Sequence, residues 1–179
     1  SLSEPAGKRQ NRVFVLGSLS IGHGLSHMFD QGFPLLLTEI AAVMGLGNLR
    51  TATLFAVKQA GSSVTSLGGG PLIDNYKRYW GLILTACMLV HALTFGAMGA
   101  STTFFALLVV VLFLSVPGSL WHLPAAAALS QRFPDRRGFA ISMHGFGSNI
   151  GNLMGPVVAG ALLASGFLIW NHVFFIYAG

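Results

Sequence analysis

The stretch that decides the fold is residues 103–129, which read TFFALLVVVLFLSVPGSLWHLPAAAAL and contain no Asp, Glu, Lys or Arg. A helix needs about 20 mostly apolar residues to cross a bilayer, so this run is long enough to do so. The runs of this kind are 13–37, 51–73, 79–98, 103–129 and 138–167, and a shorter sixth begins near residue 171. The sequence therefore predicts an all-α polytopic membrane protein, with an N-terminal tail over residues 1–12 and a helical bundle over residues 13–179.

The composition supports this class. Hydrophobic residues make up 53% of the chain and charged residues only 8%, whereas soluble domains carry roughly 25% charged residues. The basic residues do not form a stripe interleaved with aromatic residues, which argues against nucleic-acid binding. Cys87 is the only cysteine, so no disulfide can form within the chain. The first apolar run contains His27 and Asp30 and is too long for a signal peptide.

Basic residues at the ends of the apolar runs predict the orientation. They gather at one set of alternate connections, namely Lys8, Arg9, Arg12, Lys77, Arg78, Arg132, Arg136 and Arg137, while the other connections carry only Arg50. Short loops rich in Lys and Arg stay in the cytoplasm. We therefore expect a cytoplasmic N-terminus in a multi-pass protein of the inner or plasma membrane.

The first run carries three polar side chains on one predicted helical face. His23 and His27 are four residues apart and Asp30 follows three later, so all three face the same way. Ionisable groups are costly in a bilayer and usually face a cavity or a partner, and imidazole changes charge near neutral pH. Three interpretations stay open: a substrate- or proton-coupling face, structural hydrogen bonds to other helices, or a metal site. The last lacks a second cluster of ligands in the sequence, so no metal or other cofactor is predicted.

Other polar groups interrupt the remaining runs. Lys58 and Asp30 lie at similar depths. A helix rises 1.5 Å per residue, which places both about 24 Å from the end of the bundle where the N-terminus lies. A buried ion pair with Asp30 is therefore one interpretation of Lys58. The alternative is that Lys58 extends to the outer surface. His122 falls near the middle of a run that holds two prolines, as in transporter sites built on broken helices. His144 is a further candidate, and we expect His91 to pack or to line the edge of a cavity.

Two segments resemble the major facilitator superfamily at the connections between helices. Residues 70–79 read GPLIDNYKRY, which is similar to the superfamily's loop signature Gly-x-Leu-x-Asp-Arg-x-Gly-Arg-Arg, with Gly70, Asp74 and Arg78 in register. Asn75 stands where the signature has its first basic residue. The resemblance implies that this loop stabilises the outward-facing state. Residues 134–140, PDRRGFA, are similar to the superfamily's Arg-Gly-x-Ala entry to the fifth helix.

The fifth run carries the most specific motif, with Gly147, Gly151, Gly155 and Pro156 at fixed spacing. Glycines four residues apart form a groove for close helix packing, and the Gly-Pro ending resembles the antiporter signature of the superfamily's exporters. A plain packing groove is the alternative. The pair His27 and Asp30, with a histidine near a proline in the fourth run, also resembles the fosmidomycin-resistance-type branch of drug–proton antiporters.

The resemblance implies the N-terminal six-helix half of a major-facilitator fold, with the sixth helix truncated and a C-terminal half missing. It also implies a secondary transporter that works by alternating access. We expect proton-coupled export of small organic molecules, with His27, Asp30, Lys58, His122 and His144 as candidates for substrate or proton contact. The alternatives are uptake of an anion or metabolite and, from another class, a histidine-dependent enzyme embedded in the membrane. The expected partners are the lipid bilayer, protons and a small-molecule substrate, and no nucleic acid.

Overall fold

The computed structural model describes residues 6–179, and all the regular elements in this part of the chain are helices, joined by short connections, with no strand. The elements are α1 (Ala6–Val43), α2 (Asn48–Asn75), the 3-10 turn η1 (Lys77–Tyr79), α3 (Trp80–Gly99), α4 (Phe104–Arg132), α5 (Arg137–Ala164) and α6 (Trp170–Ala178). The predicted all-α class is confirmed. Residues 1–5 of the predicted tail lie outside the described part, and residues 6–12 already belong to α1.

Local chemistry explains several helix ends. The Thr103 hydroxyl caps α4 by accepting a hydrogen bond from the Ala106 amide at 3.2 Å, which satisfies one of the free donors at a helix start. Gly45 follows α1 with φ +61°, and Gly166 follows α5 with φ +71°. Glycine adopts this left-handed conformation without steric cost. The turn at Gly166 ends α5 at Ala164, three residues before the end of the predicted run.

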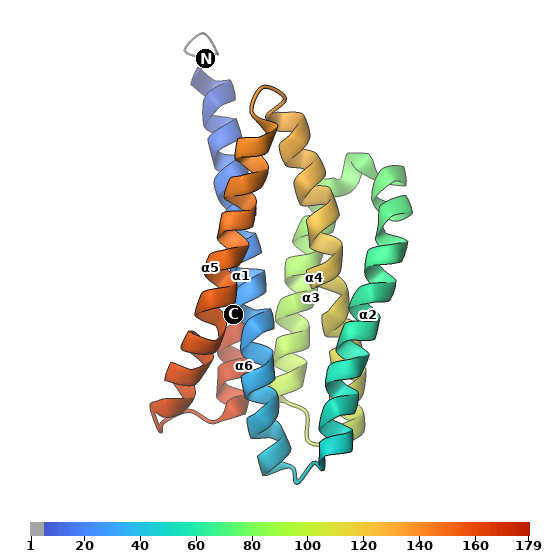
Figure 1. The fold of residues 1–179 in the computed structure, drawn as a ribbon, viewed down its shortest axis with the longest axis vertical. Helices are drawn as coiled ribbons and strands as arrows, with labels where there is room; N and C mark the ends of the chain where they lie inside the picture. The colour runs from blue at the N-terminus through green and yellow to red at the C-terminus, as the bar shows by residue number, and fades with distance from the viewer. Residues whose placement is uncertain (1–5) are drawn as a thin grey trace.

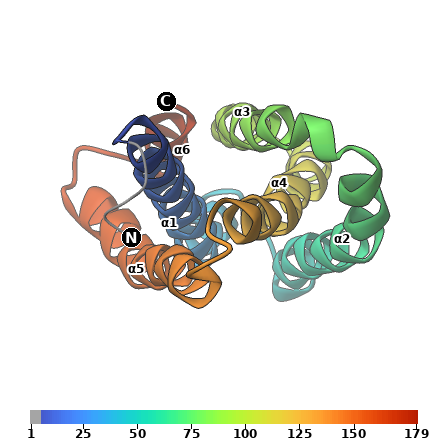
Figure 2. The same cartoon turned by 90° about the horizontal axis from the view of Figure 1, so that it is seen from above.

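Seen from above, α1, α5 and α6 lie on one side of the bundle and α2, α3 and α4 on the other (Figures 1 and 2), and α6 packs mainly against α3 across the two sides. The most extensive contacts join α1 to α5, α2 to α4, α3 to α4 and α3 to α6. Exchanging α1 with α4 and α2 with α5 turns the α1–α5 pair into the α4–α2 pair. The correspondence stops at these two pairs, because α3 packs extensively on α4 whereas α6 makes little contact with α1.

Three of the described segments are long and apolar enough by composition to cross a membrane: Lys77–Gly99, Phe104–Arg132 and Arg137–Ala164. The helices α1 and α2 have sufficient length, at 38 and 28 residues. Their apolar runs are interrupted by the polar groups described below, which lowers their hydropathy. These helices place the chain in the bilayer as a multi-pass protein.

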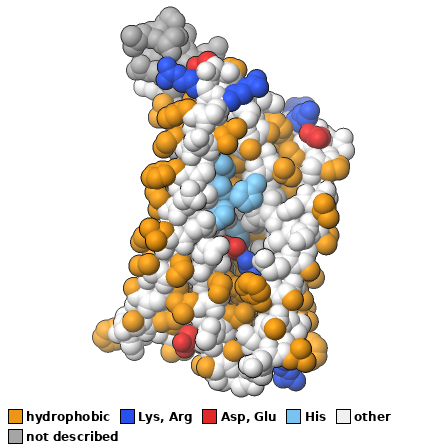
Figure 3. All heavy atoms as spheres, viewed as in Figure 1, with side chains coloured by type: hydrophobic (Ala, Val, Ile, Leu, Met, Phe, Trp, Pro, Cys, Tyr) orange, Lys and Arg blue, Asp and Glu red, His pale blue; other side chains and the backbone are white. Residues whose placement is uncertain are grey.

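The interior consists of two apolar clusters with a polar layer between them. One cluster gathers around Phe33, Leu54, Phe95 and Phe174, and the other contains Leu19, Leu84, Cys87, Trp121, Ala125 and Leu129. Along α1, the polar residues fall between Leu19 and Phe33. In Figure 3, histidine side chains show at mid-height with acidic and basic groups beside them, while most other charged groups lie at the two ends.

The α1–α5 interface depends on glycine. A Cβ added at Gly147, Gly151 or Gly155 would meet the carbonyl oxygens of Ser20, Gly24 and Met28, respectively. The contacts advance by four residues on both helices, so α1 and α5 run parallel with their backbones in close contact. The predicted packing groove on α5 is therefore present, and its partner is α1.

Candidate functional site

The candidate site begins on α1, where the predicted polar face is present. The rings of His23 and His27 lie 4.6 Å apart, centroid to centroid. One turn further on, the Asp30 carboxylate lies 2.7 Å from the Lys58 ammonium of α2. The predicted face therefore points away from lipid and towards other helices.

Helices α2 and α4 supply matching polar faces. On α2, Lys58, Ser62 and Ser66 are spaced four residues apart and therefore share one side of the helix. On α4, Ser115, Ser119 and His122 are spaced by four and then three residues and also share one side. Together with α1 these faces enclose a cavity of about 200 Å³, lined by Ser26, His27, Asp30, Ser62, Ser66, Leu114, Ser115, Gly118, Ser119 and His122.

The Lys58–Asp30 pair is the main charge interaction of the cavity. Only 7% of the Lys58 side chain is exposed, against 32% of the Asp30 side chain, which faces the cavity. The Lys58 ammonium also lies 5.6 Å from the centre of the Phe33 ring, within the range of a cation–π interaction. The predicted pairing is confirmed, with Lys58 buried and Asp30 partly exposed, and the alternative in which Lys58 extends to the outer surface is wrong.

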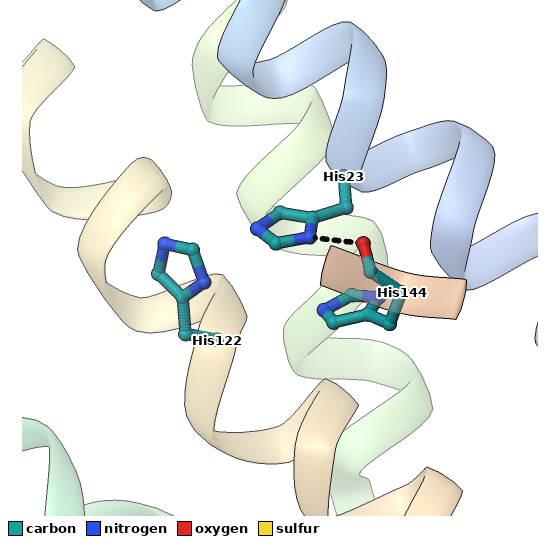
Figure 4. A group of neighbouring side chains, drawn as sticks. All are labelled: His23, His122 and His144. Carbon is teal, nitrogen blue, oxygen red and sulfur yellow. Dashed lines mark hydrogen bonds between the residues drawn. The ribbon is translucent and has the colours of Figure 1, made fainter. Parts of the chain in front are cut away.

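Histidines from three helices form a cluster next to the cavity (Figure 4). His23 of α1 stacks on His144 of α5, with centroids 4.0 Å apart and planes 13° apart, and the His122 ring of α4 approaches it edge-on at 4.7 Å. The Nδ1 atom of His23 lies 3.0 Å from the main-chain carbonyl oxygen of His144. His27 has a different hydrogen-bond partner: its Nδ1 lies 2.8 Å from the side-chain oxygen of Asn152 on α5.

The structure thus brings together most of the side chains that the sequence selected. His27, Asp30 and His122 line one cavity, Lys58 pairs with Asp30, and His144 lies behind them against His23. His91 lies outside this group: it is buried in α3 and stacks on Phe95 at 5.7 Å. This is the packing position expected for it.

The predicted conformational motifs lie away from the cavity. Gly70 and Asp74 are in the last turns of α2 and Arg78 is in η1, and all three are at or near the surface. The glycines of α5 contact α1, and Pro156 follows them within the continuous helix α5.

Sequence reasoning missed the hydroxyl groups of the site. Ser62 and Ser66 follow Lys58 at four-residue intervals, and Ser115 and Ser119 precede His122 on one face of α4. Their spacing from Lys58 and from His122, which places them on the same helical face as these residues, was the signal that could have identified them. Asn152, the partner of His27, lies among small residues of the α5 motif and had no such signal.

Comparisons with known proteins agree with this architecture. The family model described as the Major Facilitator Superfamily matches residues 19–179. A curated relative, the fosmidomycin resistance protein of Escherichia coli strain K12, is 26% identical over 161 residues, which cover 88% of this chain. The chain spans only 38% of that relative's length. No solved structure gives a significant match. The polar layer inside an apolar helical bundle and the family match over residues 19–179 lead to one conclusion: this chain belongs to the major facilitator superfamily of membrane transporters.

Proposed function

We propose that this chain forms one wall of the translocation path in a proton-coupled transporter that exports small organic molecules. The observation that carries the proposal is the polar cavity between α1, α2 and α4 inside an apolar bundle, which is lined by His27, His122 and the Asp30 carboxylate that pairs with Lys58. Polar groups at this depth are costly and mark transport paths. A second six-helix half would form the opposite wall, and the N-terminus would be cytoplasmic.

The ion pair offers a physical basis for coupling. Protonation of Asp30 would remove its attraction for the Lys58 ammonium and loosen the contact between α1 and α2. A ligand shifts a conformational equilibrium only through its different affinity for the two states. A proton on Asp30 meets this condition if the pair is closed in one state and open in the other. His27 and His122 lie within the same cavity and would pass the proton on or contact the substrate.

The direct test is transport by this chain together with the second six-helix half, reconstituted in proteoliposomes, with fosmidomycin as the probe because the relative is named for resistance to it. The wild type should accumulate the probe against its gradient when a pH gradient is imposed. Asp30→Asn should abolish uphill transport. Glu39→Gln is the matched control, because Glu39 is an exposed carboxylate near the end of the same helix. Uphill transport by Asp30→Asn would overturn the role of Asp30.

Uptake of an anion or metabolite is the second candidate. The cavity supports it because serine hydroxyls from three helices line its wall, and hydroxyl donors suit an anionic solute. The direction of transport in the same proteoliposomes separates the two. A histidine-dependent enzyme fits less well, because the family match points to a transporter.

A further inference from the structure

We propose that His23, His122 and His144 form a binding site for a divalent transition-metal ion such as Zn²⁺. The three side chains come from α1, α4 and α5 and converge in the folded chain (Figure 4). One ring nitrogen from each lies within 4.8 Å of the other two. The sequence argued against a metal because it shows no second cluster of ligands near His23 and His27. The fold supplies the missing ligands from two other helices.

The hydrogen bond of His23 prepares this ring for metal binding. Its Nδ1 lies 3.0 Å from the carbonyl oxygen of His144. A carbonyl only accepts, so Nδ1 carries the hydrogen and Nε2 keeps a free lone pair. Histidine ligands in metal sites have this arrangement, in which the nitrogen that is not bound to metal donates to a carbonyl or a carboxylate.

Unsatisfied ring nitrogens support the same conclusion. Nε2 of His23 and both ring nitrogens of His144 are buried and have no hydrogen-bond partner among the described residues. Buried polar side-chain atoms are nearly always paired, so such atoms call for an explanation. A metal ion held between the rings would satisfy Nε2 of His23 and one ring nitrogen of His144 together.

The third ligand and the access route lie on α4. His122 is exposed and lines the polar cavity, so an ion can reach the cluster through the cavity. Zinc–nitrogen bonds of about 2.0–2.1 Å place tetrahedral ligands roughly 3.4 Å apart. The nitrogens must therefore draw together by about 1.4 Å at most. This requires rotation of the exposed His122 side chain and also a turn of the stacked His23 and His144 rings relative to each other, so that their in-plane lone pairs converge on the ion.

The donor set indicates which metal would bind. Three neutral imidazoles without a carboxylate suit borderline ions such as Zn²⁺, Co²⁺ or Ni²⁺ rather than Mg²⁺ or Ca²⁺, which prefer oxygen ligands. Three protein ligands also leave one coordination position open. The inference goes beyond the transport proposal, because the Lys58–Asp30 pair is not part of the site and metal binding can be measured without transport.

The test is a titration of the purified protein with Co²⁺, followed by the visible absorption bands of the tetrahedral ion, with Zn²⁺ added in competition. The affinity tag should contain no histidine, and bound metal should first be removed by a chelator. We expect one Co²⁺ per chain in the wild type. His122→Gln should weaken binding at least tenfold, and because His122 is exposed this variant should keep its fold, which a thermal melt can verify.

Two further variants separate the site from nonspecific binding. His91→Gln removes a histidine that is also buried with an unpartnered Nε2 but lies outside the cluster. His172→Gln removes an exposed histidine at the start of α6. Both should bind Co²⁺ as the wild type does. The proposal is overturned if the wild type shows no tetrahedral Co²⁺ bands, if His122→Gln binds with unchanged affinity, or if the two control variants lose binding to the same extent as His122→Gln.

Discussion

At the scale of single residues, the ion pair between Lys58 and Asp30 dominates the energetics of the polar layer. Removing two charges from water is costly, and their attraction offsets this cost only while both partners are present. Lys58 is almost fully enclosed, and Asp30 keeps contact with the cavity. The pair therefore contributes little net stability over two neutral residues, but each charge depends strongly on the other.

This dependence gives a testable asymmetry. Lys58→Met should destabilise the protein by about 3 kcal/mol, near the lower end of the range for breaking buried pairs because Asp30 is partly exposed. The double variant Lys58→Met/Asp30→Asn should recover much of the loss. Thermal melts in detergent would measure both. Lys77→Met, which removes an exposed lysine in η1, should have little effect. Equal losses in the single and double variants would show that the two charges do not depend on each other.

The sequence predicted this pair but not the serines around it, for a physical reason. A charged side chain within an apolar run is so costly in free energy that it calls for an opposite charge, which can be searched for at the same depth in another run. A serine hydroxyl can bond to its own helix, as Ser115 does to the Leu112 carbonyl at 2.6 Å. Its presence in a membrane helix therefore carries little information until the facing helices are known.

At the scale of secondary-structure elements, the parallel contact between α1 and α5 depends on the absence of side chains. Gly151→Ala should be strongly destabilising because the added methyl would overlap the Gly24 carbonyl and the His27 side chain. Overpacking of this kind costs about 1–3 kcal/mol. Gly145→Ala is the matched control, since nothing lies within 4 Å of a Cβ at that position of the same helix. Thermal melts of the two variants should differ clearly, and equal melting temperatures would contradict the packing described here.

The glycine spacing predicted a packing face on the fifth helix but did not identify its partner. That partner is α1, whose backbone carbonyls of Ser20, Gly24 and Met28 lie against the three glycines of α5. Nothing in the α1 sequence marks the backbone carbonyls of Ser20 and Met28 as contact points, since every residue carries such a carbonyl. The helix pairing therefore came from the structure.

A second contact between elements joins the start of α1 to the α4–α5 connection. The Arg12 guanidinium donates a hydrogen bond to the Asp135 carboxylate, and this bond holds the pKa of Asp135 below its usual value. Arg12 also lies 4.7 Å from the centre of the Phe133 ring. A carboxyl with a lowered pKa in the folded state stabilises the protein above its unfolded pKa of about 4, and this contribution is lost as the pH falls through the lowered value.

Asp135→Asn should therefore lower the melting temperature slightly at pH 7, and the difference from the wild type should disappear at acid pH. The effect should be small, because the carboxylate is exposed and solvent screens the pair. Melting curves of both proteins at neutral and acid pH, at low and high salt, would measure it. A difference that persists unchanged in acid would mean that the charge of Asp135 is not its cause.

At the scale of the whole molecule, a polar layer lies between two apolar clusters, and most other charged side chains lie at the two ends of the bundle, beyond the apolar clusters. The apolar runs and basic flanks were sufficient to predict the bundle and its class. The correspondence between the α1–α5 and α4–α2 pairs was not visible in the sequence, because it lies in which helices pack together rather than in matching residues. In these pairs α1 and α4 take corresponding places; α1 contributes His23 and His27 to the polar layer, and α4 contributes His122.

The central claim is that the cavity between α1, α2 and α4 is a water-accessible path that opens to both sides of the membrane. The most direct measurement replaces Ser119 with cysteine in a Cys87→Ala background and follows its modification by a membrane-impermeant thiol reagent added to one side at a time. Leu93→Cys is the control, because Leu93 lies on the apolar outer surface of α3. The account predicts that the cysteine at position 119 reacts from either side, while the cysteine at position 93 does not react. A cysteine at position 119 that reacts from only one side of the membrane, or from neither, would contradict the account.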